Sequence, residues 1–169
     1  MKILGVGLSR TGTTTLAKTL QRSGLNIVHN PKTESELLKL KNKDGACDIP
    51  VVAYYKKLDK LFPGSKFVYT FREEESWKDA IERFAKDKPI KAQWQRQLRE
   101  MVYGSNMFDE SWFDAHKRHH DDLMEYFKDR PNDIITLNIV GGDTPEKLYQ
   151  FLGIKNVPKS FKVYNEGKK

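Results

Sequence analysis

The sequence has a single cysteine and no run of apolar residues that approaches the roughly 18 needed to cross a membrane. One cysteine excludes an internal disulfide, and a chain without disulfides suits a reducing compartment, so we expect a cytoplasmic protein. No histidine follows Cys47 at a spacing that suggests a nucleophile, and we interpret Cys47 as a small core residue. The first residues begin an apolar strand pattern rather than a signal peptide, so no membrane contact is expected.

Nucleic-acid-binding patterns are also missing, although the chain is basic. It has 30 Lys and Arg against 23 Asp and Glu, a formal net charge of +7. The basic residues are spread along the chain without a helix-turn-helix, RNA-recognition or zinc-finger motif, so we predict no nucleic-acid partner. The spacing of His116 and His120 would suit zinc on a helix, but a third ligand and the HExxH glutamate are lacking, and no metal site is predicted. The positive charge therefore indicates an anionic cofactor.

What the sequence does contain is an alternation of short strand patterns with amphipathic helix patterns. We predict one domain over residues 1–169, with a three-layer α/β fold and a mostly parallel central sheet of about four or five strands flanked by helices. The strands are expected at residues 3–6, 25–28, 66–71 and 134–138. The first two should pair in parallel through a right-handed crossover, and residues 43–50 should form a loop.

A loop of glycine, serine and threonine joins the first expected strand to the first expected helix. Gly7 and Gly12 bracket four residues, as in a Walker loop, but Thr13 stands where the Walker lysine would follow. The only cation in the loop is Arg10. Backbone N–H groups and the dipole at such a helix N-terminus favour an anion, so we predict a phosphate-like ligand. Because an NTPase needs the missing lysine on its phosphates, the loop predicts a different chemistry.

The sequence Gly-Leu-Ser-Arg-Thr-Gly-Thr-Thr at residues 7–14 resembles the 5′-phosphosulfate loop of sulfotransferases that use 3′-phosphoadenosine 5′-phosphosulfate (PAPS). Residues 62–72, with Trp77 beyond them, resemble the family's strand that ends in a 3′-phosphate-binding arginine. The segments after His119 follow the order of small, largely bacterial-type sulfotransferase-like proteins. The resemblance implies a P-loop NTPase-like fold and PAPS as cofactor. It also implies that the 5′-phosphosulfate is held by Ser9, Arg10, Thr11, Gly12, Thr13 and Thr14.

The resemblance assigns the 3′-phosphate to Arg72. Many sulfotransferases have a serine eight residues after this arginine, where this chain has Ala80, and Ser76 is the nearer substitute. The competing interpretation pairs Arg72 with an acid at residues 73–75, although acids there also suit the first turn of a helix. A guanidinium at the carboxyl end of a strand can bind a phosphate in a bidentate manner, which favours the phosphate.

Two residues are candidates for the base that accepts the acceptor's proton. His29 follows the second expected strand, at the edge where ligands bind in open α/β sheets, or it is a turn histidine bonded to backbone. Asp48 stands in an Asp-x-Pro that small sulfotransferase-like proteins often carry, and it is expected to be either a helix N-cap or the base. Together with Arg10, which stabilises the transferring group, Asp48 and His29 form the predicted catalytic set.

The acceptor is expected to be a small molecule or a glycan that presents a hydroxyl or an amine. Residues 82–118 carry aromatic side chains outside any strand pattern and are expected either to cover the acceptor or to pack in a helical core. These aromatic residues are Trp94, Tyr103, Phe108 and Trp112.

Two other functions use the same loop. A nucleotide or small-molecule kinase would place Thr13 or Thr14 on Mg²⁺, but the missing lysine and the lack of an acid at a strand end count against it. A non-catalytic nucleotide-binding homologue is favoured by Ala80 and by the small size of the chain.

Overall fold

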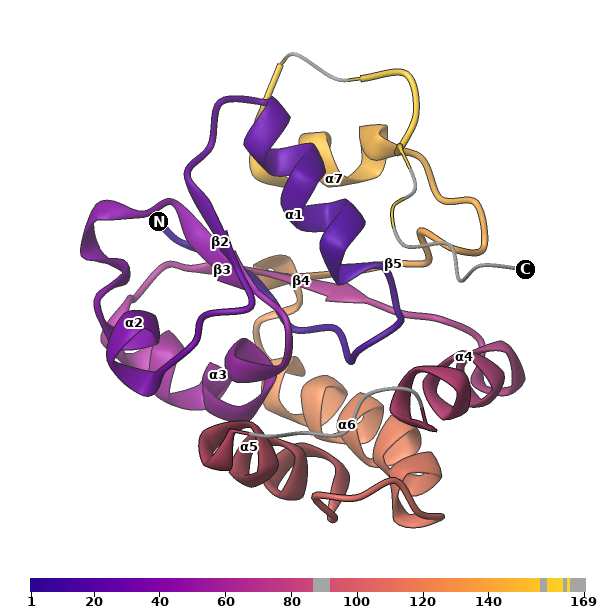
Figure 1. Cartoon of the computed structure of the whole chain (residues 1–169). Helices are drawn as coiled ribbons and strands as arrows, with labels where there is room; N and C mark the ends of the chain where they lie inside the picture. The colour runs from indigo at the N-terminus through magenta and orange to yellow at the C-terminus, as the bar shows by residue number, and fades with distance from the viewer. Residues whose placement is uncertain (87–91, 156–157, 163, 165–169) are drawn as a thin grey trace.

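The computed structural model describes residues 1–86, 92–155, 158–162 and 164. Its centre is a five-stranded sheet in the order β2-β3-β1-β4-β5, and all four pairings are parallel (Figure 1). The strands are β1 (Ile3–Gly5), β2 (Ile27–His29), β3 (Gly45–Cys47), β4 (Lys66–Thr70) and β5 (Ile134–Leu137). The predicted α/β class and parallel sheet are therefore confirmed.

The third strand corrects two predictions. Residues 43–50 were expected to form a loop, but Gly45–Cys47 is a fully buried strand. It lies between β1 and β2, so the expected direct pairing of the first two strands is wrong. A Cβ on Gly45 would come within 1.8 Å of the carbonyl oxygen of Ile3, so only glycine allows the strands this close. Glycine and alanine have low strand propensity, which is why the pattern of the sequence did not reveal β3.

Helices cover both faces of the sheet and form the outer layers (Figure 1). Side chains of a strand alternate between its faces, so Ile3 packs in the core with α1 and α7, and Leu4 packs on the opposite face with α2, α3 and α6. A third cluster beneath the β1–α1 loop joins α4, α5 and α6. The helices are α1 (Thr13–Arg22), α2 (Glu34–Leu38), α3 (Ile49–Leu61), α4 (Glu74–Lys86), α5 (Gln93–Tyr103), α6 (Ser111–Phe127) and α7 (Pro145–Leu152).

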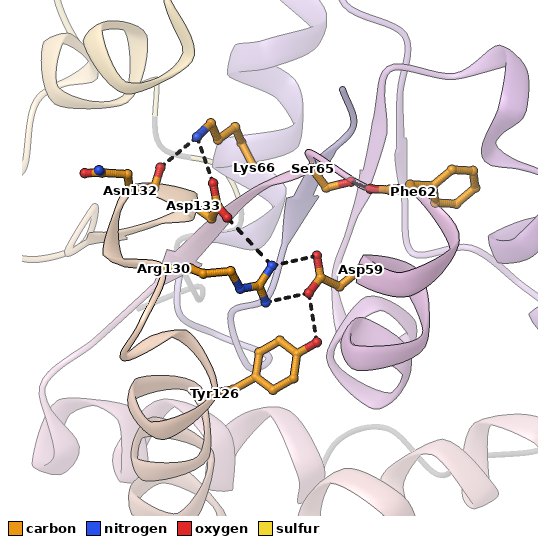
Figure 2. A network of polar contacts seen from close by, with 8 residues as sticks. All are labelled: Asp59, Phe62, Ser65, Lys66, Tyr126, Arg130, Asn132 and Asp133. Carbon is orange, nitrogen blue, oxygen red and sulfur yellow. Dashed lines mark hydrogen bonds and ion pairs between the residues drawn. The ribbon is translucent and has the colours of Figure 1, made fainter.

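A polar network ties α3 and the end of α6 to the amino-terminal end of β4 (Figure 2). Arg130 donates to both carboxylate oxygens of Asp59, at 2.6 and 3.3 Å, and the Tyr126 hydroxyl donates to Asp59 at 2.8 Å. Asp133 lies 3.7 Å from Arg130 and accepts from Lys66 at 3.0 Å. Lys66 pairs with Ile3 at the first residues of β4 and β1, so the network lies at the end of the sheet opposite to the β1–α1 loop and supports the fold rather than the site.

Within the described part of the chain, no helix is both long and apolar enough to span a membrane.

Candidate active site

The β1–α1 loop is fastened to the last residue of β4. The Thr11 hydroxyl donates to the Leu8 carbonyl at 2.7 Å, so the Thr70 hydroxyl donates the hydrogen bond of 2.7 Å that joins it to Thr11. A Cβ at Gly7 would lie 1.8 Å from the Thr70 hydroxyl oxygen, so glycine is required where the loop crosses β4. The path of the loop is therefore set by contacts that are already made without a ligand.

Two buried aromatic side chains hold the backbone of Ser9 from both sides. The Trp77 indole donates to the Ser9 carbonyl at 2.9 Å, and the Ser9 amide donates to the Tyr103 hydroxyl at 3.1 Å. The Tyr103 ring stacks on Trp112, with centroids 4.1 Å apart and planes 13° apart. The next residue, Arg10, lies in the left-handed region at φ 72°.

The first turn of α1 faces the loop with amides that a helix cannot satisfy internally. Gly12 is its N-cap, at φ 106°, and supplies no side-chain cap, while the first turn contains no acidic residue. Thr13 is buried, whereas Thr14 is partly exposed beside the loop. The amides at a helix N-terminus whose own first turn holds no acidic side chain attract an anion.

Arg72 brings a second guanidinium to this loop from the carboxyl end of β4. It donates to the Arg10 carbonyl at 3.2 Å and, through Nε, to the Ser76 hydroxyl at 2.8 Å. Burial and the positive charges of Arg10 and Arg83 lower the pKa of Arg72, although a guanidinium remains charged at neutral pH. The three residues Arg10, Arg72 and Ser76, all predicted to bind the cofactor, therefore lie together.

The competing interpretation of Arg72 paired it with an acid at residues 73–75. Glu74 and Glu75 pair instead with Lys78, at 2.7 and 3.4 Å, and Glu73 accepts a hydrogen bond from Asn138. Ala80, at the position where a second phosphate-binding serine was considered, is buried. Ser76 is thus the hydroxyl that lies beside the arginine.

Two histidines of α6 form hydrogen bonds to backbone carbonyls just after the ends of β1 and β4. His116 donates through Nε2 to the Arg72 carbonyl at 2.8 Å, and His119 donates through Nε2 to the Val6 carbonyl at 2.7 Å. A carbonyl can only accept, so both rings carry their proton on Nε2. Burial lowers the pKa of His119 to about 4, and the ring is neutral at pH 7. Within the described residues, no group of three or more His, Cys, Asp or Glu side chains could hold a metal ion.

The two candidate bases, His29 and Asp48, form a pair. His29 ends β2 opposite Cys47 of β3, and Asp48 follows directly, so neighbouring strand ends place them together. The Nε2 of His29 lies 3.3 Å from an Asp48 carboxylate oxygen and 3.3 Å from the Thr14 hydroxyl. The pair therefore stands beside the first turn of α1, at the carboxyl edge of the sheet.

Asp48 is the N-cap of α3, which is one of the two roles that were considered for it. Its carboxylate accepts from the Ile49 amide at 2.9 Å and caps α3, which confirms the N-cap prediction. Burial raises the pKa of Asp48 and outweighs the opposing effects of His29, the Ile49 amide and Lys32. Its backbone has φ 92° and ψ −179°, a region used almost only by glycine.

A cavity of about 130 Å³ opens beside the first turn of α3. Pro50 and Tyr54 of α3 face Trp94 and Leu98 of α5 across it, so part of the segment 82–118 lies over this space, while residues 87–91 lie outside the described residues. Tyr103 and Trp112, by contrast, are buried in the core. The remaining lining residues are Thr33, Glu34, Gln97 and Met101.

Sequence reasoning missed the residues that hold the site in place. Trp77 and His119 were noted only as part of the family resemblance, and Tyr103 was expected either to cover the acceptor or to pack in a helical core. Their contacts with the loop join residues 68, 94 and 113 positions apart. No local pattern in the sequence signals such contacts.

Comparison with known proteins adds one finding. A family model described as a sulfotransferase domain matches residues 30–169, whereas no curated protein matches the chain. The matched range contains Asp48, Arg72 and Ser76, and the β1–α1 loop precedes it. Because the match covers most of the chain and agrees with a parallel α/β sheet, the chain belongs to the sulfotransferase family.

Proposed function

We propose that this protein transfers a sulfuryl group from PAPS to a hydroxyl or amine of an acceptor. The observation that carries the proposal is that the Arg72 guanidinium binds the backbone carbonyl of Arg10, two residues before the N-cap of α1, while the His29–Asp48 pair stands beside the first turn of the same helix. Bound PAPS would supply the activated sulfuryl group. The other requirements, which are positive charge, a base and orientation, are supplied by residues of this chain.

The donor set fits a cofactor with two separate anionic ends. Arg10 and the amides of Gly12, Thr13 and Thr14 would hold the 5′-phosphosulfate, and Thr11 shapes the loop through its bond to Thr70. Arg72 and Ser76 would hold the 3′-phosphate. Hydrogen bonds from a guanidinium to a phosphate are charge-assisted and about twice as strong as neutral ones. Donors that lie in place before the reaction need no reorganisation as charge develops.

The His29–Asp48 pair would accept the proton that the attacking hydroxyl releases. A carboxyl whose pKa is raised is a stronger base than an ordinary aspartate, and Asp48 meets this condition. The contact of 3.3 Å between Nε2 of His29 and the carboxylate is short enough for a proton to pass between the two side chains. We therefore assign the base to the pair rather than to either residue.

The cavity beside α3 is the proposed acceptor site. It is lined by Pro50, two residues after Asp48, and its volume of about 130 Å³ suits one ring of a small molecule or glycan. Replacing Trp94 with alanine should raise the acceptor KM and leave cofactor affinity unchanged. A variant that lost affinity for the cofactor instead would contradict this assignment.

One observation favours a P-loop kinase as a second candidate. The lack of an acid at a strand end counted against it, but Asp48 directly follows β3, the strand beside β1, so that argument was wrong. P-loop NTPases hold Mg²⁺ between the loop Ser/Thr and a strand-end aspartate. Here the His29 ring contacts both Thr14 and Asp48, so it occupies the direct path between them. This arrangement favours a proton-accepting pair over a shared metal.

Calorimetric titration separates the two candidates. We expect 3′-phosphoadenosine 5′-phosphate, the desulfated product, to bind without magnesium. Arg72→Ala should weaken this binding about 10- to 100-fold, the effect of one lost charged hydrogen bond, and should leave ADP binding unchanged. Lys117→Ala, which removes a paired surface cation on α6, is the matched control. Binding of ATP that requires magnesium, without binding of the 3′-phosphorylated nucleotide, would overturn the proposal.

Measurement of kcat tests whether the positive charge of Arg10 in the β1–α1 loop acts on the transferring group. Arg10→Ala should lower kcat about 10²- to 10³-fold, the usual effect of losing one charged contact in the transition state. Its melting temperature should match that of the wild type, because the Arg10 carbonyl that accepts from Arg72 remains. An unchanged kcat would show that Arg10 does not act on the transferring group.

A further inference from the structure

A second, larger cavity of about 580 Å³ lies at the other end of α1, where the C-terminal segment passes the helix. In Figure 1 this segment, in yellow, runs close to the end of α1 and to α7. The volume falls within the range of roughly 300–1,000 Å³ that is typical of ligand sites. Its lining residues, named here the basic pocket, are Thr19, Arg22, Ser23, Lys155, Pro158, Ser160 and Lys162.

We infer that the basic pocket binds a small molecule that carries several phosphate or sulfate groups. Arg22, Lys155 and Lys162 line the cavity, and no carboxylate does. Several surface cations elsewhere are paired with a carboxylate, as Lys56 is with Asp122. The three cations of the pocket make no ion pair with any residue the structure describes. Cations of one sign gathered in a concave surface concentrate anions.

The positions of two of these cations are set before a ligand arrives. The Tyr164 ring lies under both, 5.2 Å from the Arg22 guanidinium and 6.0 Å from the Lys162 ammonium. The Tyr164 amide donates to the Thr15 hydroxyl at 3.3 Å, and Phe161 packs against the core beside α7. The C-terminal segment is therefore held against α1, which lowers the entropic cost of gathering the charges around a ligand.

The basic pocket is separate from the sulfuryl-transfer site. Helix α1 has ten residues, so its two ends lie about 15 Å apart. A helix C-terminus ordinarily repels anions through its open carbonyls, but in the last turn of α1 the carbonyls of Thr19, Leu20 and Gln21 accept hydrogen bonds from amides of the following residues. Three cations attract a ligand with several negative charges more strongly than a simple carboxylate. This inference is independent of the proposed transferase activity.

Titration with inorganic pyrophosphate and with a sulfated disaccharide tests the inference. The experiment uses the Arg10→Ala, Arg72→Ala double variant, in which the loop site is weakened. We expect at least one of the two probes to bind. Lys162→Ala and Arg22→Ala should each weaken binding about fivefold, as expected for an exposed charge, and together by more than tenfold. Stronger binding of pyrophosphate would assign the pocket to phosphate esters, and stronger binding of the disaccharide would assign it to sulfate esters.

The controls distinguish binding at the basic pocket from general electrostatic attraction of anions to a basic protein. Lys117→Ala removes a cation of the opposite helical layer and should leave binding unchanged, and melting temperatures check that each variant folds. Lys155→Ala provides a further variant in an exposed position if Arg22→Ala fails to fold. Absence of binding, or equal weakening by Lys117→Ala, would overturn the inference. Failure of the transferase proposal would appear separately, as loss of nucleotide binding at the loop in the wild type.

Discussion

Asp48 is the residue at which stability and function should oppose each other. Its φ of 92° and ψ of −179° lie in a region that only glycine occupies without strain, and such an outlier costs roughly 1–3 kcal/mol. Asp48→Gly removes this strain. It also removes the cap on Ile49, worth a few tenths of a kcal/mol against glycine, and adds about 0.5–1 kcal/mol of unfolded-state entropy. We therefore expect Asp48→Gly to raise the free energy of unfolding by about 1 kcal/mol.

Asp48→Ala is the matched control because it keeps a Cβ in the strained conformation and loses the same cap. It should lower the free energy of unfolding by about 1 kcal/mol. For a domain of this size, 1 kcal/mol corresponds to roughly 2–4 °C in melting temperature. Both variants should lose turnover because both lack the carboxylate. Urea denaturation and thermal melts at pH 7 measure the difference, and a glycine variant no more stable than the alanine variant would refute the reasoning.

Asp48→Asn isolates the charge. Asparagine retains the cap and the backbone strain but cannot ionise. The raised pKa of Asp48 means that its carboxyl holds a proton more tightly in the folded protein than in the unfolded chain, where the pKa is about 3.9. The stability of the wild type relative to Asp48→Asn should therefore fall as the pH rises above about 4 and level off above the folded-state pKa. A relative stability that rises with pH would contradict the assigned direction.

Three further predictions concern the supports of the site. Tyr103→Phe leaves the Ser9 amide without its acceptor and should lower the free energy of unfolding by about 1–3 kcal/mol; an unchanged urea midpoint would count against this clamp. His119 binds a proton near pH 6.5 when unfolded but near 4 when folded, so the wild type should lose about 2 kcal/mol between pH 7.5 and 5. His119→Gln should lose less over this interval, and parallel pH profiles would show that His119 is not responsible. Arg130→Met leaves Asp59, 9% exposed, without its guanidinium and should cost about 1–3 kcal/mol with turnover unchanged; loss of turnover in a stable variant would place the network in the site.

The elements with strong local signals were predictable from the sequence. The loop and the first helix follow from the glycine and threonine spacing and the amphipathic pattern after it, and the aromatic and β-branched residues of β4 mark a strand. The strand β3 carries no such signal, since Gly-Ala-Cys is neither alternating nor rich in strand-forming residues. Its position between β1 and β2 is set by close backbone approach, which composition does not encode.

The site was predictable as a set of residues but not as an arrangement. Arg10 and Arg72 were predicted from their positions after strands. Their contact could not be predicted, because Arg72 binds the backbone carbonyl of Arg10, whose direction depends on the left-handed conformation of Arg10. His29 and Asp48 were treated as alternatives because β3, the strand that brings them together, was not predicted from the sequence. The register that sets His29 beside Cys47 makes them one pair, and only the sheet order supplies that information.

Backbone strain offers an independent argument for where the chemistry occurs. Among the described residues, three that are not glycine have positive φ: Arg10, Asn30 and Asp48. They follow β1, β2 and β3, so all three lie at the carboxyl edge of the sheet, where ligands bind in open α/β folds. Asparagine adopts this conformation readily, but arginine and aspartate do so at a cost that glycine would avoid. Strain at the predicted sulfuryl-binding cation and at the predicted base is explained if their side chains are needed at these positions. An Asp48→Gly variant that is more stable but has lost turnover would show that the strained backbone of Asp48 is retained for function.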